Sequence, residues 1–325
     1  MSAKKKFTKI FYATDVHGSE ICFRKFLSAT THYGAEVLVL GGDVTGKMII
    51  PIIENADGSY RCNFAGKEYV TKTKEETQQI ETKIRDSGYY VYHSTSDEAI
   101  ELQNDKEKLD RLFLNIMKEN LLRWVEMAEE HLKGTDTICY ITGGNDDHQE
   151  TLDAIKDSAH VKNPDNKVIR IDEIHEMANL GWGNPTPWNC PRDLSSEEEL
   201  GRLIEKLIGQ VKDMSNCVFN FHVPPIDSGL DSAPMLDSSV FPPKPVIRGG
   251  QQVIIGVGSS AIRAAVEKLQ PLLVLSGHIH ESRGTARVGK TLVLNPGSEY
   301  PEGVLRGAII NIGDRKVVSY QLTSG

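Results

Sequence analysis

Short apolar runs are separated by longer polar segments throughout the chain. The clearest runs lie at 9–14, 36–40, 138–142, 217–221 and 272–275. A nearly continuous apolar run of this length is typical of a strand that is covered on both faces, as in a parallel sheet between helices. The pattern therefore predicts an α/β fold, in which strands alternate with helices before a strand-rich second half.

Helices are predicted where a capping residue precedes apolar positions at a helical spacing. Ser19 has the side chain of an N-cap and predicts a first helix that runs to about residue 30. Thr73 and Glu76 have the spacing of a capping box, which predicts a short polar helix. Over 97–132 the apolar residues repeat at a helical spacing, and this predicts one long helix or a helix with a break.

The segment from about 44 to 134 interrupts the alternation of strands and helices. Asp57-Gly58 is a turn signal, and the stretches 48–50 and 60–64 on either side of it predict a hairpin. We find no repeat, low-complexity tract or clear linker in the sequence. We therefore expect a single domain over 1–325, with an inserted hairpin and helices at about 44–134.

Polar side chains with metal-binding chemistry follow the apolar runs. The first run leads into Asp15 and His17, and the last run leads into His278 and His280. Alternate residues of a strand point to the same face, so both members of each pair can face one site. The runs between them end at further candidates, which are Asp43, Asn145 and His222. Because ligands bind at the strand ends of open α/β sheets, these positions together predict one metal site.

The order of these motifs is distinctive. The motifs are, in order, Asp-x-His, Gly-Asp, Gly-Asn-x-Asp, an isolated His and Gly-His-x-His. Together they resemble the ligand signature of the calcineurin-like metallophosphoesterases. The resemblance extends along the chain from Asp15 to the segment 295–298. Within that family the chain is similar to small prokaryotic phosphoesterases related to bacterial cyclic-nucleotide phosphodiesterases. The resemblance implies a four-layer α/β/β/α sandwich of two mixed sheets, and the activity of a metal-dependent phosphoesterase.

The resemblance also implies two metal ions held by two ligand sets and one bridging carboxylate. The sets are Asp15, His17 and His280 for the first metal, and Asn145, His222 and His278 for the second, with Asp43 as the bridge. Mixed His, Asp and Asn ligation suits divalent Mn, Fe, Zn, Co or Ni better than Ca. We expect a metal-bridging hydroxide to attack phosphorus in line, with a phosphodiester preferred to a monoester.

One position departs from the family pattern. Many members carry a histidine directly after the motif asparagine, and it stabilises the transition state or protonates the leaving group. Asp146 stands at that place here, and an unperturbed aspartate is a poor acid at pH 7 because its pKa is about 3.9. His148, two residues further on, is a second candidate acid, against the alternative of an ordinary loop histidine.

Composition narrows the choice of partners. The net charge of −8 argues against broad nucleic-acid binding, so a small phosphoester is the expected substrate. No apolar stretch approaches the roughly 20 residues that a membrane helix needs. Five scattered cysteines without C-x-x-C spacing indicate free thiols in a reducing cytoplasm. The oligomeric state is left open.

Several alternatives remain at this point. One alternative is a nuclease, which would need a basic groove. Another is a non-catalytic scaffold on the same fold, which would have lost metal ligands. Every expected ligand is present here, so Asp146 is the only support for a scaffold. Trp182 and Trp188 could form an apolar lip that stacks a base or aryl group, although loop packing is the favoured interpretation. Arg192 could reach a phosphate from the same loop, but a surface ion pair is the default expectation.

Overall fold

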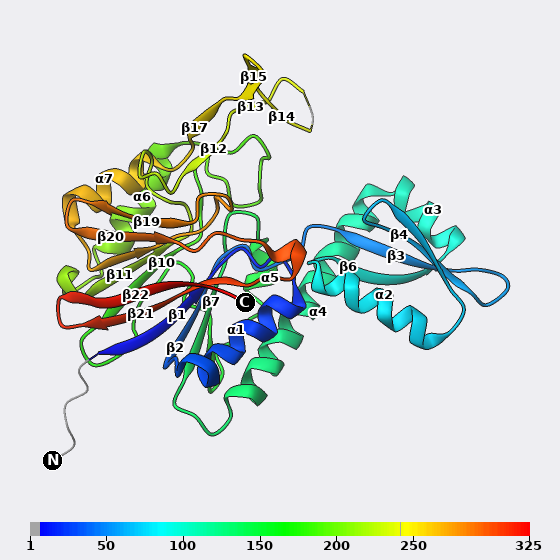
Figure 1. Cartoon of the computed structure of the whole chain (residues 1–325), viewed down its shortest axis with the longest axis horizontal. Helices are drawn as coiled ribbons and strands as arrows, with labels where there is room; N and C mark the ends of the chain where they lie inside the picture. Colours follow the sequence, from blue (N-terminus) through cyan, green and yellow to red (C-terminus); the bar gives the residue numbers. More distant parts are fainter. Residues whose placement is uncertain (1–6, 241) are drawn as a thin grey trace.

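Two six-stranded mixed sheets form the centre of the molecule (Figure 1). The computed structural model describes residues 7–240 and 242–325. In spatial order, the first sheet contains β22 (Lys316–Ser324), β21 (Arg306–Gly313), β1 (Thr8–Ala13), β2 (Val37–Gly41), β7 (Ile138–Thr142) and β8 (Val161–Lys162). The second contains β19 (Gly284–Val288), β20 (Thr291–Asn295), β18 (Leu273–Leu275), β11 (Cys217–Phe221), β10 (Glu176–Leu180) and β9 (Val168–Arg170).

The central strands of both sheets are parallel, and antiparallel strands close both edges of the second sheet and one edge of the first. Strands β1, β2, β7 and β8 run parallel in the first sheet, as do β10, β11, β18 and β20 in the second. Along β1, Ile10 and Tyr12 face the other sheet, while Phe11 and Ala13 face the helices. This alternation with both faces buried explains why the strand is apolar throughout.

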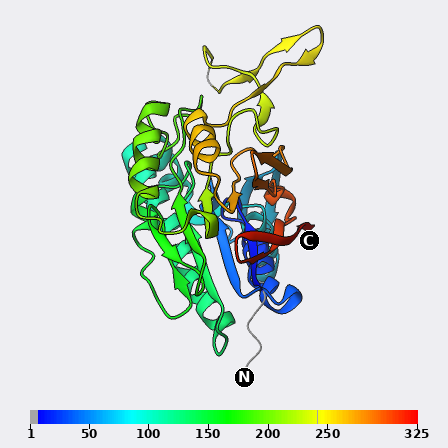
Figure 2. The ribbon, with the colours of Figure 1, turned by 90° about the vertical axis from the view of Figure 1, so that its left-hand side faces the viewer.

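Helices cover the outer face of each sheet. Helices α1 (Glu20–Tyr33) and α4 (Lys106–Leu132) pack on the first sheet, where the rings of Phe23 and Trp124 stack with centroids 4.2 Å apart. Helices α6 (Glu197–Ile208) and α7 (Ser260–Leu269) pack on the second sheet. Figure 2 shows the layers from the side. The expected four-layer α/β/β/α sandwich is therefore confirmed.

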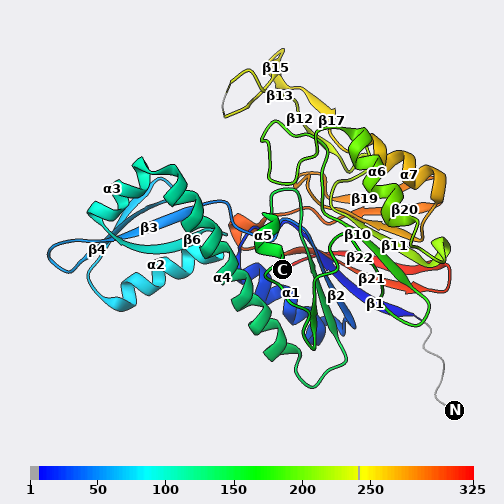
Figure 3. The ribbon, with the colours of Figure 1, turned by 180° about the vertical axis from the view of Figure 1, so that it is seen from behind.

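Part of the 44–134 segment forms a lobe beside the sandwich (Figures 1 and 3). Its four-stranded sheet contains β5 (Lys67–Thr71), β4 (Tyr60–Phe64), β3 (Ile49–Glu54) and β6 (Tyr90–Thr95), and its helices are α2 (Lys74–Asp86) and α3 (Ser96–Asn104). The hairpin expected around Asp57-Gly58 is confirmed, because Ile53 pairs with Arg61 across it. The lobe has a small core of its own, around Ile52 and Ile84.

The expected caps and the helix over 97–132 are also present. Ser19 accepts a hydrogen bond from Cys22 N, and Thr73 and Glu76 form a complete capping box. The long helix is broken at Asp105, whose side chain caps α4 by accepting from Lys108 N. Helix α4 then continues from the lobe into the core of the sandwich (Figure 3).

Smaller elements complete the described chain. Short strand pairs project as an arm, and they are β12 (Ser232–Pro234) with β17 (Ile254–Gly256), β13 (Leu236–Asp237) with β14 (Lys244–Pro245), and β15 (Ile247–Arg248) with β16 (Gln251–Gln252). The short helices are α5 (Gln149–Leu152), η1 (Met214–Asn216) and η2 (Tyr300–Glu302). Among the helices within residues 7–240 and 242–325, none is long and apolar enough to cross a membrane.

Candidate metal centre

The seven candidate ligands lie in the loops that follow five parallel strands. Asp15 and His17 follow β1, and Asp43 follows β2. The remaining ligands follow β7, β11 and β18, and they are Asn145, His222, His278 and His280. Because neighbouring parallel strands end at the same edge of a sheet, the two sheets bring these loops to one place.

Six of the seven side chains form two compact groups. In each group the ligand atoms lie within 4.8 Å of one another. One group is Asp15, His17 and His280, and the other is Asp43, His222 and His278. The Nε2 atoms of His17 and His280 are only 3.2 Å apart. Two imidazole nitrogens that converge in this way, beside a carboxylate, are arranged as a cation would require.

Asp43 belongs to the second group and also reaches His17 of the first. Its Oδ2 is 3.6 Å from His17 Nε2, and its Oδ1 is 3.3 Å from His222 Nε2. One carboxylate therefore presents one oxygen to each group. This is the arrangement that a bridging ligand between two metal ions needs.

Buried polar atoms without partners test whether metals fit this site. Within the described residues, Asn145 Oδ1 is buried and has no hydrogen-bond partner, while His222 Nε2 has only the Asp43 and Asp15 carboxylates as ionic neighbours, with Asp43 Oδ1 at 3.3 Å. The Asn145 amide nitrogen donates to Asp193 Oδ1 at 2.8 Å, so the amide oxygen is left for another ligand. A buried acceptor without a partner costs free energy. The donor set therefore fits the implied cations.

The electrostatics of the site also suit cations. Burial lowers the pKa of His278 to about 4 and, together with Lys47, that of His17 to about 3, so both imidazoles are neutral near pH 7. Neutral imidazole is the form that binds metal. Burial opposes the positive charge of His222 as well, but Asp43 and Asp15 outweigh it and raise the pKa of His222 to about 9. The two buried carboxylates thus create a strongly cation-attracting environment.

Four ligands adopt backbone conformations that non-glycine residues rarely have. The φ angles of Asp15, His17, Asp43 and His278 are 54°, 41°, 48° and 65°. Such left-handed conformations are uncommon and cluster at functional sites, where the surrounding structure must hold them in place. The ligand loops are therefore fixed by the fold rather than by local preference.

Hydrogen bonds behind the ligands orient them. The carbonyl oxygen of Gly41 accepts from His222 Nδ1 at 3.1 Å, which leaves Nε2 directed to the site. Asp147 is fully buried and accepts from the backbone of Val44, Thr45 and Gly144. The Asp147 carboxylate thereby joins the loop that carries Asp43 to the loop that carries Asn145.

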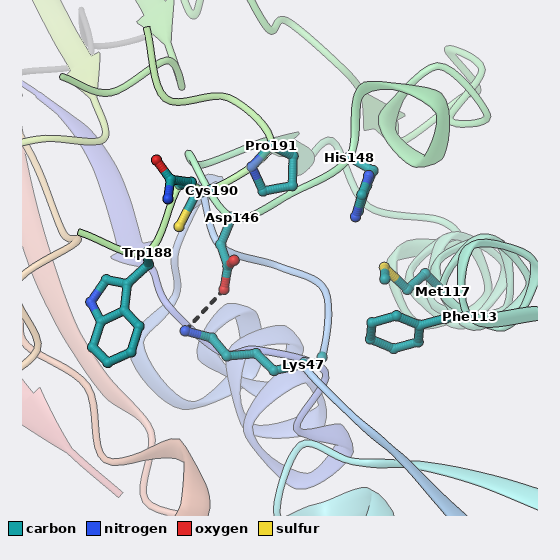
Figure 4. Close-up of a pocket in the computed structure, with 10 residues that line it drawn as sticks. Lys47, Phe113, Met117, Asp146, His148, Trp188, Cys190 and Pro191 are labelled. Atoms are coloured by element: carbon teal, nitrogen blue, oxygen red, sulfur yellow. Dashed lines mark ion pairs between the residues drawn. The ribbon is translucent and has the colours of Figure 1, made fainter. Parts of the chain in front are cut away.

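The two candidate acids lie at different places in the site. Asp146 Oδ2 is 2.9 Å from Lys47 Nζ and 3.8 Å from His17 Nδ1. Burial and the charge of Asp43 raise the pKa of Asp146, while Lys47 opposes the shift. Asp146, Lys47 and His148 all line one cavity of about 240 Å³, but Figure 4 places the His148 ring away from the Asp146–Lys47 pair. The catalytic roles of Asp146 and His148 stay predictions.

Sequence reasoning missed Lys47 and Asp193, and it misjudged Arg192. Lys47 follows Asp43 by four residues, so the Gly-Asp-x-x-Gly-Lys spacing was the available signal. Arg192 does not form a surface ion pair, because it is buried and donates to Asp165 Oδ2 at 2.6 Å. It also donates to Gly144 O and lies over the Trp182 ring, so it supports the loop that carries Asn145.

Comparisons with known proteins bear mainly on the fold. No family model matches the chain. An uncharacterized protein of Methanocaldococcus jannaschii is 32% identical over 155 residues, which are 47% of this chain and 61% of that relative. The match thus spans less than two thirds of the relative's length.

Almost the whole chain can be superposed on solved structures of other proteins. One crystal structure superposes with a TM-score of 0.58 at 14% identity, and TT1561 of Thermus thermophilus superposes with a TM-score of 0.51 at 13% identity; each match covers 98% of both chains. An archaeal phosphodiesterase matches more loosely, with a TM-score of 0.34 at 11% identity. The first two likenesses establish a shared fold. The fold and the order of the ligand loops agree with the resemblance to the calcineurin-like metallophosphoesterases.

Proposed function

We propose that this protein is a phosphoester hydrolase that uses two divalent transition metals and prefers phosphodiesters. The position of Asp43, with one carboxylate oxygen toward each of two His/Asp groups, carries the proposal. A single-metal or structural site would not need two ligand groups that share one carboxylate. The free thiols of its five cysteines suit the cytoplasm, where we propose that it acts.

Two divalent cations, when bound, would supply Lewis acidity and a hydroxide nucleophile at neutral pH. The residues of the chain would then set the charge and the orientation of the substrate. Asp146 and Lys47 form an ion pair that is neutral as a unit, so the site with its cations remains positive overall. A phosphodiester monoanion is attracted to such a site despite the acidic composition of the chain.

Lys47 is placed to bind a phosphate oxygen. It belongs to the segment between β2 and β3, and its side chain is half exposed at the cavity wall while its ammonium group reaches Asp146. The charges of Asp146 and Asp43 outweigh the effect of burial and raise the pKa of Lys47, so it carries a positive charge at neutral pH. We propose that Lys47 turns from Asp146 to the substrate phosphate.

The function is tested with purified protein stripped by a chelator and reloaded with Mn, Fe, Zn, Co or Ni. We expect hydrolysis of phosphodiesters, and weaker hydrolysis of monoesters, only when the protein holds about two metals per chain. Metal content is measured beside the rates for mono-, di- and cyclic phosphate esters. Metal-replete protein that cleaves none of these esters would contradict the proposal.

Replacement of Lys47 with methionine should raise KM for a phosphodiester and lower kcat/KM by roughly 10- to 150-fold, because a charged hydrogen bond contributes about 1.5–3 kcal/mol. Lys47→Arg should retain most of the affinity. The effect should shrink at high ionic strength, since salt screens the attraction. Lys67→Met, on β5 of the neighbouring lobe, is the matched control. Equal kinetics for the Lys47→Met and Lys67→Met variants would exclude a role for Lys47 in binding.

A further inference from the structure

A cavity of about 240 Å³ lies directly beside the Asp146–Lys47 pair. Four parts of the chain form its walls, namely the loop after β2, helix α4, the loop after β7 and the loop 188–191 (Figure 4). Its lining includes apolar side chains beside the polar ones, and the apolar residues are Phe113, Met117, Trp188 and Pro191. In Figure 4 the Asp146–Lys47 pair lies between Trp188 on one side and Phe113, Met117 and His148 on the other. The cavity is therefore continuous with the proposed phosphate site, and Trp188 forms an apolar wall next to that site.

Trp188 is held at this cavity without being buried in the core. Half of its surface is exposed, in contrast to Trp182, which packs over the Arg192 guanidinium. Packing against the protein thus accounts for the position of Trp182, but it does not account for the exposed position of Trp188. A large exposed apolar side chain beside a polar site is typical of a surface that contacts a ligand.

The loop that carries Trp188 is fixed by Asp193. Asp193 Oδ2 accepts from the backbone nitrogens of Thr186 and Cys190 at 3.1 and 2.9 Å, and from the Thr186 hydroxyl at 2.5 Å. The Thr186 hydroxyl oxygen in turn accepts from Trp188 N at 3.3 Å. Asp193 Oδ1 accepts a hydrogen bond from the side-chain amide of Asn145. One carboxylate therefore orients both a candidate metal ligand and the loop that carries Trp188. The loop is therefore preorganised relative to the metal centre.

We propose that the cavity binds a flat aromatic group of the phosphoester substrate, stacked on Trp188. The proposal rests on the proposed function and names the substrate class for that site. Drug-sized ligands occupy cavities of about 300–1,000 Å³, so the smaller volume here suits one ring system rather than a polymer. Trp188 supplies an apolar surface that an aliphatic ester as small as a methyl ester would leave unused.

Calorimetric titration of metal-loaded protein with substrate analogues tests the proposal without relying on turnover. The probes are methylphosphonate, cyclohexylphosphonate and phenylphosphonate. We expect phenylphosphonate to bind roughly tenfold more tightly than methylphosphonate, as base–aromatic stacking does elsewhere, with cyclohexylphosphonate in between. Trp188→Ala should remove this advantage and leave methylphosphonate binding unchanged, while Trp188→Phe should keep most of it.

Tyr320→Ala is the matched control, because Tyr320 is an exposed aromatic residue on β22, away from the cavity lining. Equal affinity of the wild-type protein for phenylphosphonate and methylphosphonate would overturn the proposal, as would an equal loss for both in Trp188→Ala. If the same protein still cleaves phosphodiesters, the aromatic subsite alone has failed. If it cleaves no phosphoester at all, the proposed function has failed.

A second pair of probes distinguishes two sources of the aromatic group. Adenosine monophosphate and ribose 5-phosphate differ in the base alone. Tighter binding of adenosine monophosphate that depends on Trp188 would support a nucleotide ester as the substrate. Equal binding of these two compounds, together with the phenylphosphonate advantage, would support a simple aryl ester.

Discussion

Asp43→Asn is expected to reduce bound metal from two ions to at most one per chain and to lower kcat/KM by at least about 10²–10³-fold, the cost of removing a single stabilising group in other active sites. The substitution keeps the size of the side chain and an oxygen that can accept from Asp146 N. Asparagine also tolerates the φ of 48° found at this position. The variant should therefore fold normally. It should lack only the negative charge that two bound cations would share. Metal analysis and steady-state kinetics on the same sample measure both effects.

Asp227→Asn is the control for this variant. Asp227 has a similar φ of 54°, but it lies outside the two ligand groups. It should retain two metals and full activity. If Asp43→Asn kept both metals as firmly as Asp227→Asn does, Asp43 would not be a bridging ligand, and a dinuclear centre would lose its main support.

The sequence predicted the fold well because its strands are buried on both faces. A strand such as β1 has no solvent-exposed face, so its apolar run is visible without any structure. The resemblance supplied the arrangement into two sheets, which apolar runs alone do not define. The ligand positions were visible for a related reason, since polar groups such as Asp15 and His222 stand out immediately after an apolar strand.

The residues around the ligands could not be predicted in the same way. Lys47 reaches Asp146 across about a hundred positions of the chain, and only the folded loops show that contact. Arg192 was expected at the surface because most arginines are there, yet Asp165 and the Trp182 ring compensate its burial. The Gly-Asp-x-x-Gly-Lys spacing marks Lys47 but not its contact with Asp146. No sequence spacing marks the pairing of Arg192 with Asp165. Tertiary packing, rather than a local pattern, determines what these side chains do.

Gly144→Ala should disrupt the metal centre by adding a single methyl group. A Cβ atom at this position would lie 2.7 Å from His222 Nε2 and would overlap Asp43 Oδ1. Gly144 has no positive φ, so the strain would come from these contacts alone. Overpacking of this kind costs about 1–3 kcal/mol, and a misplacement of about 1 Å lowers activity by about 10²-fold. We therefore expect a lower Tm, fewer than two metals per chain and at least that loss in kcat/KM.

Gly201→Ala is the control, because it adds the same methyl group where there is room for it. It separates the loss of the metal centre from any general effect of a glycine-to-alanine substitution. Gly201 lies in helix α6, and its nearest neighbour would be the Cβ of Ala261 at 3.8 Å. Alanine at a helical position is favoured over glycine by about 1 kcal/mol, so Tm should be unchanged or higher and metal binding intact. A Gly144→Ala protein as active and as metal-rich as Gly201→Ala would mean that Asp43 and His222 are free to move apart. In that case the close approach of the β2, β7 and β11 loops would not be what holds the centre together.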